Sequence, residues 1–231
     1  MFAIATTTLA IAGCAERFPV RRVYCVGRNY ADHAREMGAD PDREPPFYFT
    51  KPADAVFTDS EGYGGGPAHQ LPYPPQTQNL HHEIELVVAL AHGGTDLDAD
   101  TAQEHVWGYG VGVDLTRRDM QDVAKQSRRP WDLAKGFDAS GPVSALVPAG
   151  SVDPSRGRIW LSVDDDLRQE GDLADQIWPV ADVVAHLSKS VTLRPGDLIM
   201  TGTPAGVGAI ARGQRVRGGI DGVGEISFVV H

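Results

Sequence analysis

A short stretch that changes from polar to apolar organises the pattern of this chain. His81-His82-Glu83-Ile84-Glu85 is polar at four of its five positions, and residues 86–90 continue as an unbroken apolar run. This pattern predicts a strand that is buried along most of its length. Since side chains two apart on a strand share a face, Glu83 and Glu85 should point the same way, with Cβ atoms roughly 6.6 Å apart.

Further apolar runs, separated by turn residues, predict many strands and few helices. The most amphipathic helix is expected over 177–190, with Val180, Val183, Val184 and Leu187 on one face. The pattern indicates a β-rich α+β fold. The expected strands are 3–14 (edge strands), 20–26, 47–52 and 109–116, and hairpins are expected over 159–170 and 218–230. The other expected helices are 28–38, 98–106 and 117–125.

Three local features refine this outline. In the helix expected over 28–38, Asn29 and Gly38 are suitable caps. Residues 58–79 predict a long irregular loop, of a kind that is often functional. Asp164-Asp165-Asp166 is interpreted as the turn of a hairpin rather than a metal-binding loop, because aspartate is common in turns for local hydrogen-bonding reasons.

Composition narrows the classes of partner. The 231 residues suffice for one large domain, and a hydrophobic content of 42% with a charged content of 23% is typical of globular proteins. A formal net charge of -10 argues against nucleic acid or an anionic membrane as partner, because both repel an acidic protein. An anionic substrate would then need a local cation.

The two cysteines, Cys14 and Cys25, do not suggest a disulfide framework. Ile11-Ala12-Gly13-Cys14 resembles a bacterial lipoprotein cleavage box, but no Lys or Arg precedes it, so the positive region of an export signal is missing. No apolar stretch is long enough to span a bilayer. We expect a cytoplasmic protein; the alternative, an exported ligand-binding lipoprotein, rests on the Cys14 box alone.

The two glutamates are candidate metal ligands. At an effective dielectric of about 20, their repulsion is worth roughly 2.5 kcal/mol, which a bound cation would relieve. Asp114 ends the second apolar run, 109–116, and offers a third carboxylate. A set of carboxylates suits Mg²⁺ or Mn²⁺ better than Zn²⁺. Taken alone, Glu-x-Glu is more often a pair of solvated glutamates.

Two further motifs could take part in chemistry. His33 and Glu36 are three residues apart, so on a helix the carboxylate can orient the imidazole for general-base catalysis, although such pairs are often simply solvated. Lys135 lies in the mostly apolar stretch 131–137, where the simpler interpretation is a surface lysine whose stem covers an aromatic ring. The glycine-rich stretch 201–208 is expected to form a tight loop whose backbone amides line a site.

Together these motifs resemble the fumarylacetoacetate hydrolase superfamily, from about residue 20 to the C-terminus. The matching segments, in chain order, are Tyr24-Cys25-Val26-Gly27-Arg28-Asn29-Tyr30-Ala31-Asp32-His33, Lys51-Pro52, Asn79-Leu80-His81-His82-Glu83-Ile84-Glu85-Leu86, Gly112-Val113-Asp114-Leu115-Thr116, Trp131-Asp132-Leu133-Ala134-Lys135-Gly136-Phe137-Asp138, Arg168-Gln169 and Gly196-Asp197-Leu198-Ile199-Met200-Thr201-Gly202-Thr203-Pro204. The chain departs from the pattern at Asp164-Asp165-Asp166, where many relatives have an Asn-Gly turn, and in a glycine-rich insert around 61–70.

The resemblance implies a fold and a site. The fold is a mixed β-sandwich roll of the family's C-terminal-domain type, in residues 20–231, preceded by an N-terminal extension over 1–19 and usually assembled as a homodimer. Each chain would bind one Mg²⁺ or Mn²⁺ ion. The implied metal ligands are Glu83, Glu85 and Asp114; the implied catalytic residues are His33, Glu36 and Lys135; and the implied substrate-binding residues are Arg28, Arg118, Gln121 and Thr203.

Within the superfamily, residues 18–30 and 43–55 are most similar to fumarylpyruvate hydrolases of bacterial gentisate breakdown. The implied activity is hydrolysis of a C–C bond in a 2,4-dioxo acid, with 3-fumarylpyruvate as the best candidate. Acylpyruvate hydrolases of other substrate range, oxaloacetate decarboxylases and dienol-acid isomerases share most of these residues and remain alternatives.

Overall fold

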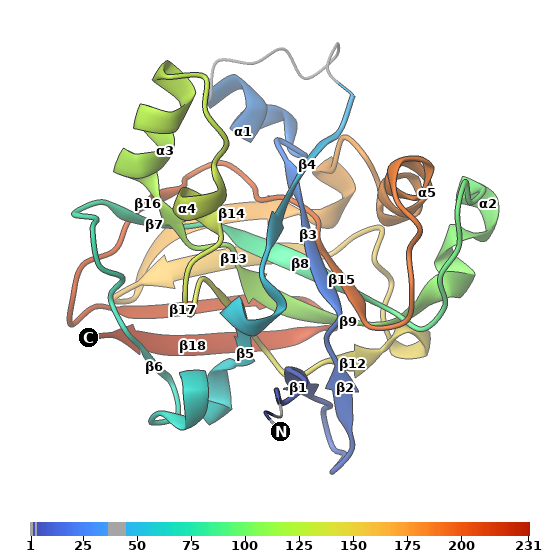
Figure 1. Cartoon of the computed structure of the whole chain (residues 1–231), viewed down its shortest axis with the longest axis horizontal. Coiled ribbons are helices and arrows are strands. Elements are labelled where there is room, and N and C mark those ends of the chain that lie inside the picture. The colour runs from blue at the N-terminus through green and yellow to red at the C-terminus, as the bar shows by residue number, and fades with distance from the viewer. Residues whose placement is uncertain (1, 3, 37–44) are drawn as a thin grey trace.

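The computed structural model describes residues 2, 4–36 and 45–231, and its dominant feature is a pair of packed β-sheets (Figure 1). Among the described residues the larger sheet has eight strands and the smaller has five. Both are mixed, because β15 runs parallel to β3, β11 to β5 and β18 to β6, while the other pairs are antiparallel. The β-rich α+β class expected from the sequence is confirmed.

The strands have the following order and bounds. The larger sheet runs β4 (Phe47–Lys51), β3 (Arg22–Gly27), β15 (Asp197–Met200), β8 (Ile84–Leu90), β9 (Val106–Val113), β11 (Gly141–Val143) and β5 (Val56–Thr58), with β12 (Val147–Pro148) on β9. The smaller runs β14 (Asp166–Asp172), β13 (Arg158–Val163), β17 (Arg215–Ile220), β18 (Gly224–Val230) and β6 (Gln70–Leu71). A short sheet joins β10 (Thr116–Arg117), β7 (Leu80–His82) and β16 (Gly208–Ala209), and β1 (Thr8–Ala10) pairs with β2 (Arg17–Pro19).

Strand β8 lies at the centre of the larger sheet, and both of its faces are buried. Ile84, Leu86 and Val88 belong to the main core, whereas Val87 and Ala89 belong to a second core that also contains Leu9 of β1. The alternation follows from the period of two along a strand. Because Glu83 and Glu85 share the parity of Val87, they lie on the face directed away from the main core.

Close packing of β8 against β9 depends on glycine. A Cβ added at Gly112 would lie 2.5 Å from the Val87 side chain, so glycine leaves room for that side chain between the paired strands. The register of the pair places Glu85 opposite Gly112 and Ile84 opposite Val113. Continued by one residue, this register places Asp114 opposite Glu83, whose carbonyl oxygen accepts from the Asp114 N–H at 2.8 Å.

The helices gather at two places around the sheets. Helices α1 (Ala31–Glu36), α3 (Arg118–Gln126) and α4 (Asp132–Lys135) lie at one end of the molecule, and α2 (Ala99–Ala102) packs beside α5 (Val180–Ser190) at its side (Figure 1). The expected apolar face of α5 is buried in the main core, with Val180, Val183, Val184 and Leu187. None of the helices in the described ranges is long and apolar enough to cross a membrane.

Two local predictions are corrected. Asn29 does not use its side chain as a helix cap: its amide donates to the carbonyl oxygens of Trp178 (2.9 Å) and Thr201 (2.7 Å) and accepts from the Trp178 N–H. Gly38, the other expected cap, lies outside the described residues. The loop 58–79 is interrupted by short 3₁₀ turns and by β6, and Tyr63 within it packs on Phe57.

The hairpin predicted over 159–170 is confirmed as β13 and β14. Asp164 and Asp165 form its two-residue turn with φ values of 50° and 69°. Positive φ at both positions is typical of a type I′ turn, which matches the twist of the two strands. The Asp164 carboxylate accepts from the backbone N–H of Arg215 on β17 at 2.8 Å, so its hydrogen bond is to the neighbouring strand rather than within the turn.

Candidate active site

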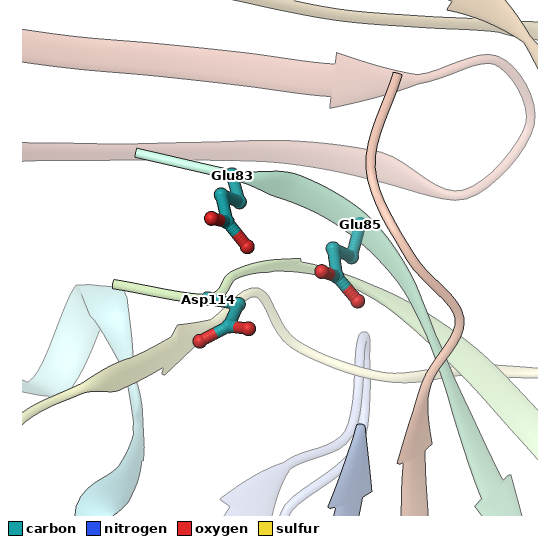
Figure 2. Close-up of side chains that lie close together, drawn as sticks. All are labelled: Glu83, Glu85 and Asp114. Carbon is teal, nitrogen blue, oxygen red and sulfur yellow. The ribbon is translucent and has the colours of Figure 1, made fainter. Parts of the chain in front are cut away.

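Three carboxylates meet where β8 begins and β9 ends. Glu83 precedes β8, Glu85 is its second residue, and Asp114 follows β9 (Figure 2). One oxygen from each lies within 4.8 Å of the others, and all three residues are buried. The alternation along the strand and the pairing of the two strands are sufficient to bring them together.

Two lysines from separate elements balance part of this charge. Lys135 Nζ, at the end of α4, donates to Glu83 Oε2 and Asp114 Oδ2 at 2.7 Å each. Lys51 Nζ, at the end of β4, lies 2.8 Å from Asp114 Oδ1. Both ammonium groups are almost fully buried, so the interpretation of Lys135 as a snorkelling surface lysine is wrong.

Arg118 anchors the other side of Glu83. Its Nη2 donates to Glu83 Oε1, its Nη1 to Gln121 Oε1 at 2.6 Å, and its Nε to His81 Nδ1 at 3.3 Å. Burial, followed by the charge of Arg118, lowers the pKa of His81 to about 4, so that ring is neutral and can accept. The guanidinium is therefore held by protein groups on three sides.

The two glutamates have opposite electrostatic environments. Burial alone would raise the pKa of Glu83, but Lys135 and Arg118 together hold that pKa below its ordinary value. Burial raises the pKa of Glu85, and the charges of Asp114 and Glu83 raise it further. The backbone N–H of Gly202, donating at 2.7 Å, favours the charged form of Glu85 and only partly offsets these effects.

This donor set fits a hard divalent cation. A cation among the three carboxylates would remove the repulsion that acts on Glu85, and oxygen-only ligands are those that Mg²⁺ and Mn²⁺ prefer. Gly202 has a φ of 95°, a left-handed conformation that suits glycine, and this conformation accompanies the hydrogen bond from its N–H to Glu85. The expectation that the loop 201–208 lines the site with a backbone amide agrees with this contact.

The hydrogen bonds of Gln121 and Thr203 leave donors for a ligand. Gln121 Oε1 accepts from Arg118, so its Nε2 remains as a donor. Thr203 Oγ1 accepts from Gln169 Nε2 at 2.7 Å, so its own hydroxyl hydrogen is available for another acceptor. Both side chains line the cavity that contains Glu83 and Glu85.

Gln169, on β14 of the smaller sheet, connects the loop 201–208 to the start of β8 by hydrogen bonds. Its Oε1 accepts from His82 Nδ1 (2.8 Å) and the Ile84 N–H (3.1 Å), and its Nε2 also donates to the carbonyl oxygen of Pro204 (2.9 Å). All its hydrogen-bonding capacity is used inside the protein. Gln169 thus positions the backbone beside Glu83 and the hydroxyl of Thr203.

His33 of α1 is buried and lines the same cavity, where a positive charge on its ring would lower the pKa of Glu83. Glu36 ends α1, but its side chain lies outside the described part of the structure. The pairing of His33 with Glu36 therefore stays a prediction.

The remaining wall of the cavity is cationic and aromatic. Arg28, which follows β3 with a φ of 58°, has its guanidinium 5.5 Å from the centre of the Phe47 ring. Lys125 of α3 and Trp131 also line this wall. Residues 61–70 are not among the described residues that line this cavity.

Comparison with known proteins agrees with this architecture. Residues 22–231 match the family model described as fumarylacetoacetate (FAA) hydrolase, C-terminal. The chain belongs to the fumarylacetoacetate hydrolase family. Its fold is therefore that of the family's C-terminal domain, as the resemblance implied.

Several members of the fumarylacetoacetate hydrolase family are similar over nearly the whole chain. A fumarylpyruvate hydrolase from Pseudomonas aeruginosa, solved with Mn²⁺ and pyruvate, is 53% identical with a TM-score of 0.95, covering 100% of this chain and 97% of that one. A candidate fumarylpyruvate hydrolase from Burkholderia cenocepacia is 57% identical with a TM-score of 0.90, covering 100% and 96%. The mitochondrial oxaloacetate tautomerase of Rattus norvegicus is 42% identical over 91% of both chains.

Proposed function

We propose that this chain hydrolyses the C3–C4 bond of a 2,4-dioxo acid, best 3-fumarylpyruvate, giving fumarate and pyruvate. The observation that carries the proposal is the similarity, at 53% identity over the full chain, to a fumarylpyruvate hydrolase crystallised with Mn²⁺ and pyruvate. The buried carboxylates and the free donors around them supply the groups that such a reaction needs.

The 2-oxo acid end of the substrate binds at the carboxylate cluster. Glu83, Glu85 and Asp114 would hold Mg²⁺ or Mn²⁺, which would supply a Lewis acid for the 2-oxo group. Gln121 Nε2 and the Thr203 hydroxyl donate to the oxygens of the substrate. The ammonium of Lys135 has three hydrogens, of which two are donated to Glu83 and Asp114, and the third can stabilise a developing oxyanion.

His33 is the general base. Oriented by Glu36, it takes a proton from water, and the water oxygen bonds to C4 of the substrate. The C3–C4 bond then breaks: fumarate keeps C4, and the enolate of pyruvate receives at C3 the proton that His33 took. For the ionised acids the balance is fumarylpyruvate plus water to fumarate, pyruvate and one released proton. Arg28, at the cationic wall, pairs with the far carboxylate of the substrate.

A second candidate function is chemistry on oxaloacetate. It is favoured by the 42% identity to the rat oxaloacetate tautomerase. Decarboxylation or tautomerisation of oxaloacetate would use the same carboxylate cluster, but needs no water attack at C4.

Side-by-side assays separate the two. The purified protein with Mg²⁺ or Mn²⁺ is tested on fumarylpyruvate, acetylpyruvate and oxaloacetate, following loss of the diketone absorbance and formation of pyruvate. We expect cleavage of fumarylpyruvate to be fastest. Rapid turnover of oxaloacetate with no cleavage of either dioxo acid would refute the hydrolase proposal.

A further inference from the structure

One part of the cavity wall is cationic and aromatic, and the proposed reaction uses only Arg28 from it. Arg28, Phe47, Trp131 and Lys125 form a continuous row of side chains, and all four line the cavity. The Phe47 and Trp131 rings meet edge to face at 5.8 Å and 84°. Lys125 Nζ lies 5.3 Å from the centre of the Trp131 ring, as Arg28 lies over Phe47. A cation therefore stands at each end of an aromatic pair.

Local structure fixes where these cations stand. Lys125 lies four residues after Gln121 and seven after Arg118 on α3, so the three side chains share one face of that helix. That face borders the cavity, because all three residues line it. Arg28 leaves β3 in a left-handed conformation, next to Gly27, where an added Cβ would lie 2.1 Å from the Phe47 ring.

The ammonium group of Lys125 lies over the Trp131 ring, whereas Lys51, Lys135 and Arg118 each contact a carboxylate. Lys51 and Lys135 are paired with Asp114, and Arg118 is held by Glu83, Gln121 and His81. Burial, followed by the charge of Arg118, lowers the pKa of Lys125, so a bound anion would favour its charged form. The cavity thus has an acidic end suited to a metal and a basic wall suited to a carboxylate.

We propose that Lys125 determines substrate specificity by binding the distal carboxylate of the acyl chain, together with Arg28. The favoured substrates are then 2,4-dioxo acids that carry a second, terminal carboxylate, rather than acylpyruvates with an apolar acyl group. The flat Phe47 and Trp131 rings suit a planar unsaturated chain between the two carboxylates. This inference rests on the proposed function and adds to it the class of acyl group.

The kinetic test compares substrates with and without the distal carboxylate. In Lys125→Gln, kcat/KM for fumarylpyruvate should fall about 10- to 100-fold, the range expected for one hydrogen bond to a charged group, while kcat/KM for acetylpyruvate stays within about twofold. Lys125→Arg, which keeps the charge, should retain most of the preference. Arg128→Gln is the matched control, because it removes a nearby exposed charge that does not line the cavity.

Equal loss on both substrates, or no change on fumarylpyruvate, would overturn the role of Lys125. A binding measurement keeps this result separate from the hydrolase proposal. Calorimetry with Mg²⁺ compares 2-oxoheptanedioate with 2-oxoheptanoate, which have the same chain length and differ only in the terminal carboxylate. Tighter binding of the diacid that is lost in Lys125→Gln supports the inference even if neither dioxo acid is cleaved; equal binding of the two ligands by the unmodified protein contradicts it.

Discussion

Lys135 Nζ donates to Asp114 Oδ2 at 2.7 Å in a region where both side chains are buried. The same ammonium group donates to Glu83, so one cation joins the start of β8 to the end of β9. Burial alone would lower the pKa of Lys135, but Asp114 and Glu83 raise that pKa, which keeps the lysine charged.

Lys135→Met should therefore destabilise the protein strongly. Removing one partner of a buried ion pair leaves the other charge uncompensated, and we expect the free energy of unfolding to fall by about 3–5 kcal/mol in urea titrations without metal. Lys189→Met, at an exposed position on α5, is the control and should change it by less than about 0.5 kcal/mol. A Lys135→Met protein as stable as the parent would contradict this account of the site.

Activity should require a divalent cation. Asp114→Asn and Glu85→Gln should each weaken Mn²⁺ binding, measured by calorimetry, by about tenfold or more and lower kcat/KM in parallel. Glu85→Gln is the cleaner change, because Glu85 makes no ion pair with Lys51 or Lys135 that its loss would disturb. Full activity after exhaustive chelation would rule out the metal.

Loss of His33 should slow the chemical step and leave metal binding unchanged. General-base catalysis typically contributes about 10²–10⁴-fold, so His33→Ala should lower kcat by that factor while the Kd for Mn²⁺ stays the same. His92→Ala, an exposed histidine outside the cavity lining, is the matched control. A decrease smaller than about fivefold would mean that another group takes the proton.

Gln169 should matter for both stability and activity, although it does not line the cavity. Gln169→Leu removes the buried partners of the Ile84 N–H and the Pro204 carbonyl oxygen, at about 1–3 kcal/mol for each unsatisfied group. Gln169→Glu keeps the acceptor for the Ile84 N–H but loses the donor to Thr203. We expect this variant to lose less unfolding free energy than Gln169→Leu and still to have a lower kcat/KM than the parent. If both variants equal the exposed control Gln126→Leu in urea unfolding and in kcat/KM, Gln169 has no positioning role.

Asp119 should contribute to the decrease in unfolding free energy at low pH. Burial alone would raise the pKa of Asp119, but hydrogen bonds from Thr77 Oγ1 (2.6 Å) and the backbone N–H groups of Gln78 (3.0 Å) and Met120 (2.9 Å) hold it below its ordinary value. A lowered pKa in the folded state means that the stabilisation is fully present above the unfolded pKa of about 3.9 and is lost as the pH falls through the folded pKa.

Asp119→Asn should thus be less stable than the parent by about 1 kcal/mol at pH 7, with the difference shrinking below about pH 4. Urea unfolding at pH 7, 5 and 3 measures this. Asp122→Asn, an exposed change on the same helix, provides the comparison. A difference that grows towards low pH would have the wrong sign and exclude this origin.

Local sequence patterns predicted several strands and the shared face of Glu83 and Glu85, but not β15 at the centre of the larger sheet. The set of Glu83, Glu85 and Asp114 followed from the resemblance, and the pairing of β8 with β9 brings the three together. Local patterns could not predict the burial of Lys135 or the contact of Lys51 with Asp114. These contacts depend on how α4 and the end of β4 pack against the sheet, and neither periodicity nor charge spacing encodes that packing. The resemblance included the Lys51-Pro52 and Arg168-Gln169 segments without giving Lys51 or Gln169 a role.

The same limit explains Asn29 and Arg118. Asparagine is a common residue type at helix N-caps, but the side-chain amide of Asn29 instead donates to the carbonyl oxygens of Trp178 and Thr201, which are far away in the chain. The resemblance implies a substrate-binding role for Arg118; three of its five N–H donors are used by Glu83, Gln121 and His81, and the role stays a prediction. Lys125, on the same face of α3, was not singled out, because a lysine on an amphipathic helix has no distinguishing local signal.

The hairpin turn at Asp164 and Asp165 is a place where a substitution by glycine could raise the stability of the protein. Both residues adopt left-handed backbone conformations, which cost a non-glycine residue roughly 1–2 kcal/mol. Asp164 offsets part of this cost through its hydrogen bonds to Gln214 and Arg215, which leaves position 165 as the one that glycine would suit. A lineage that acquires glycine there gains tolerance for destabilising changes elsewhere. Because the turn does not line the cavity, glycine at position 165 would raise stability without changing the residues that contact the substrate. The added stability could then offset the cost of mutations that change the substrate preference.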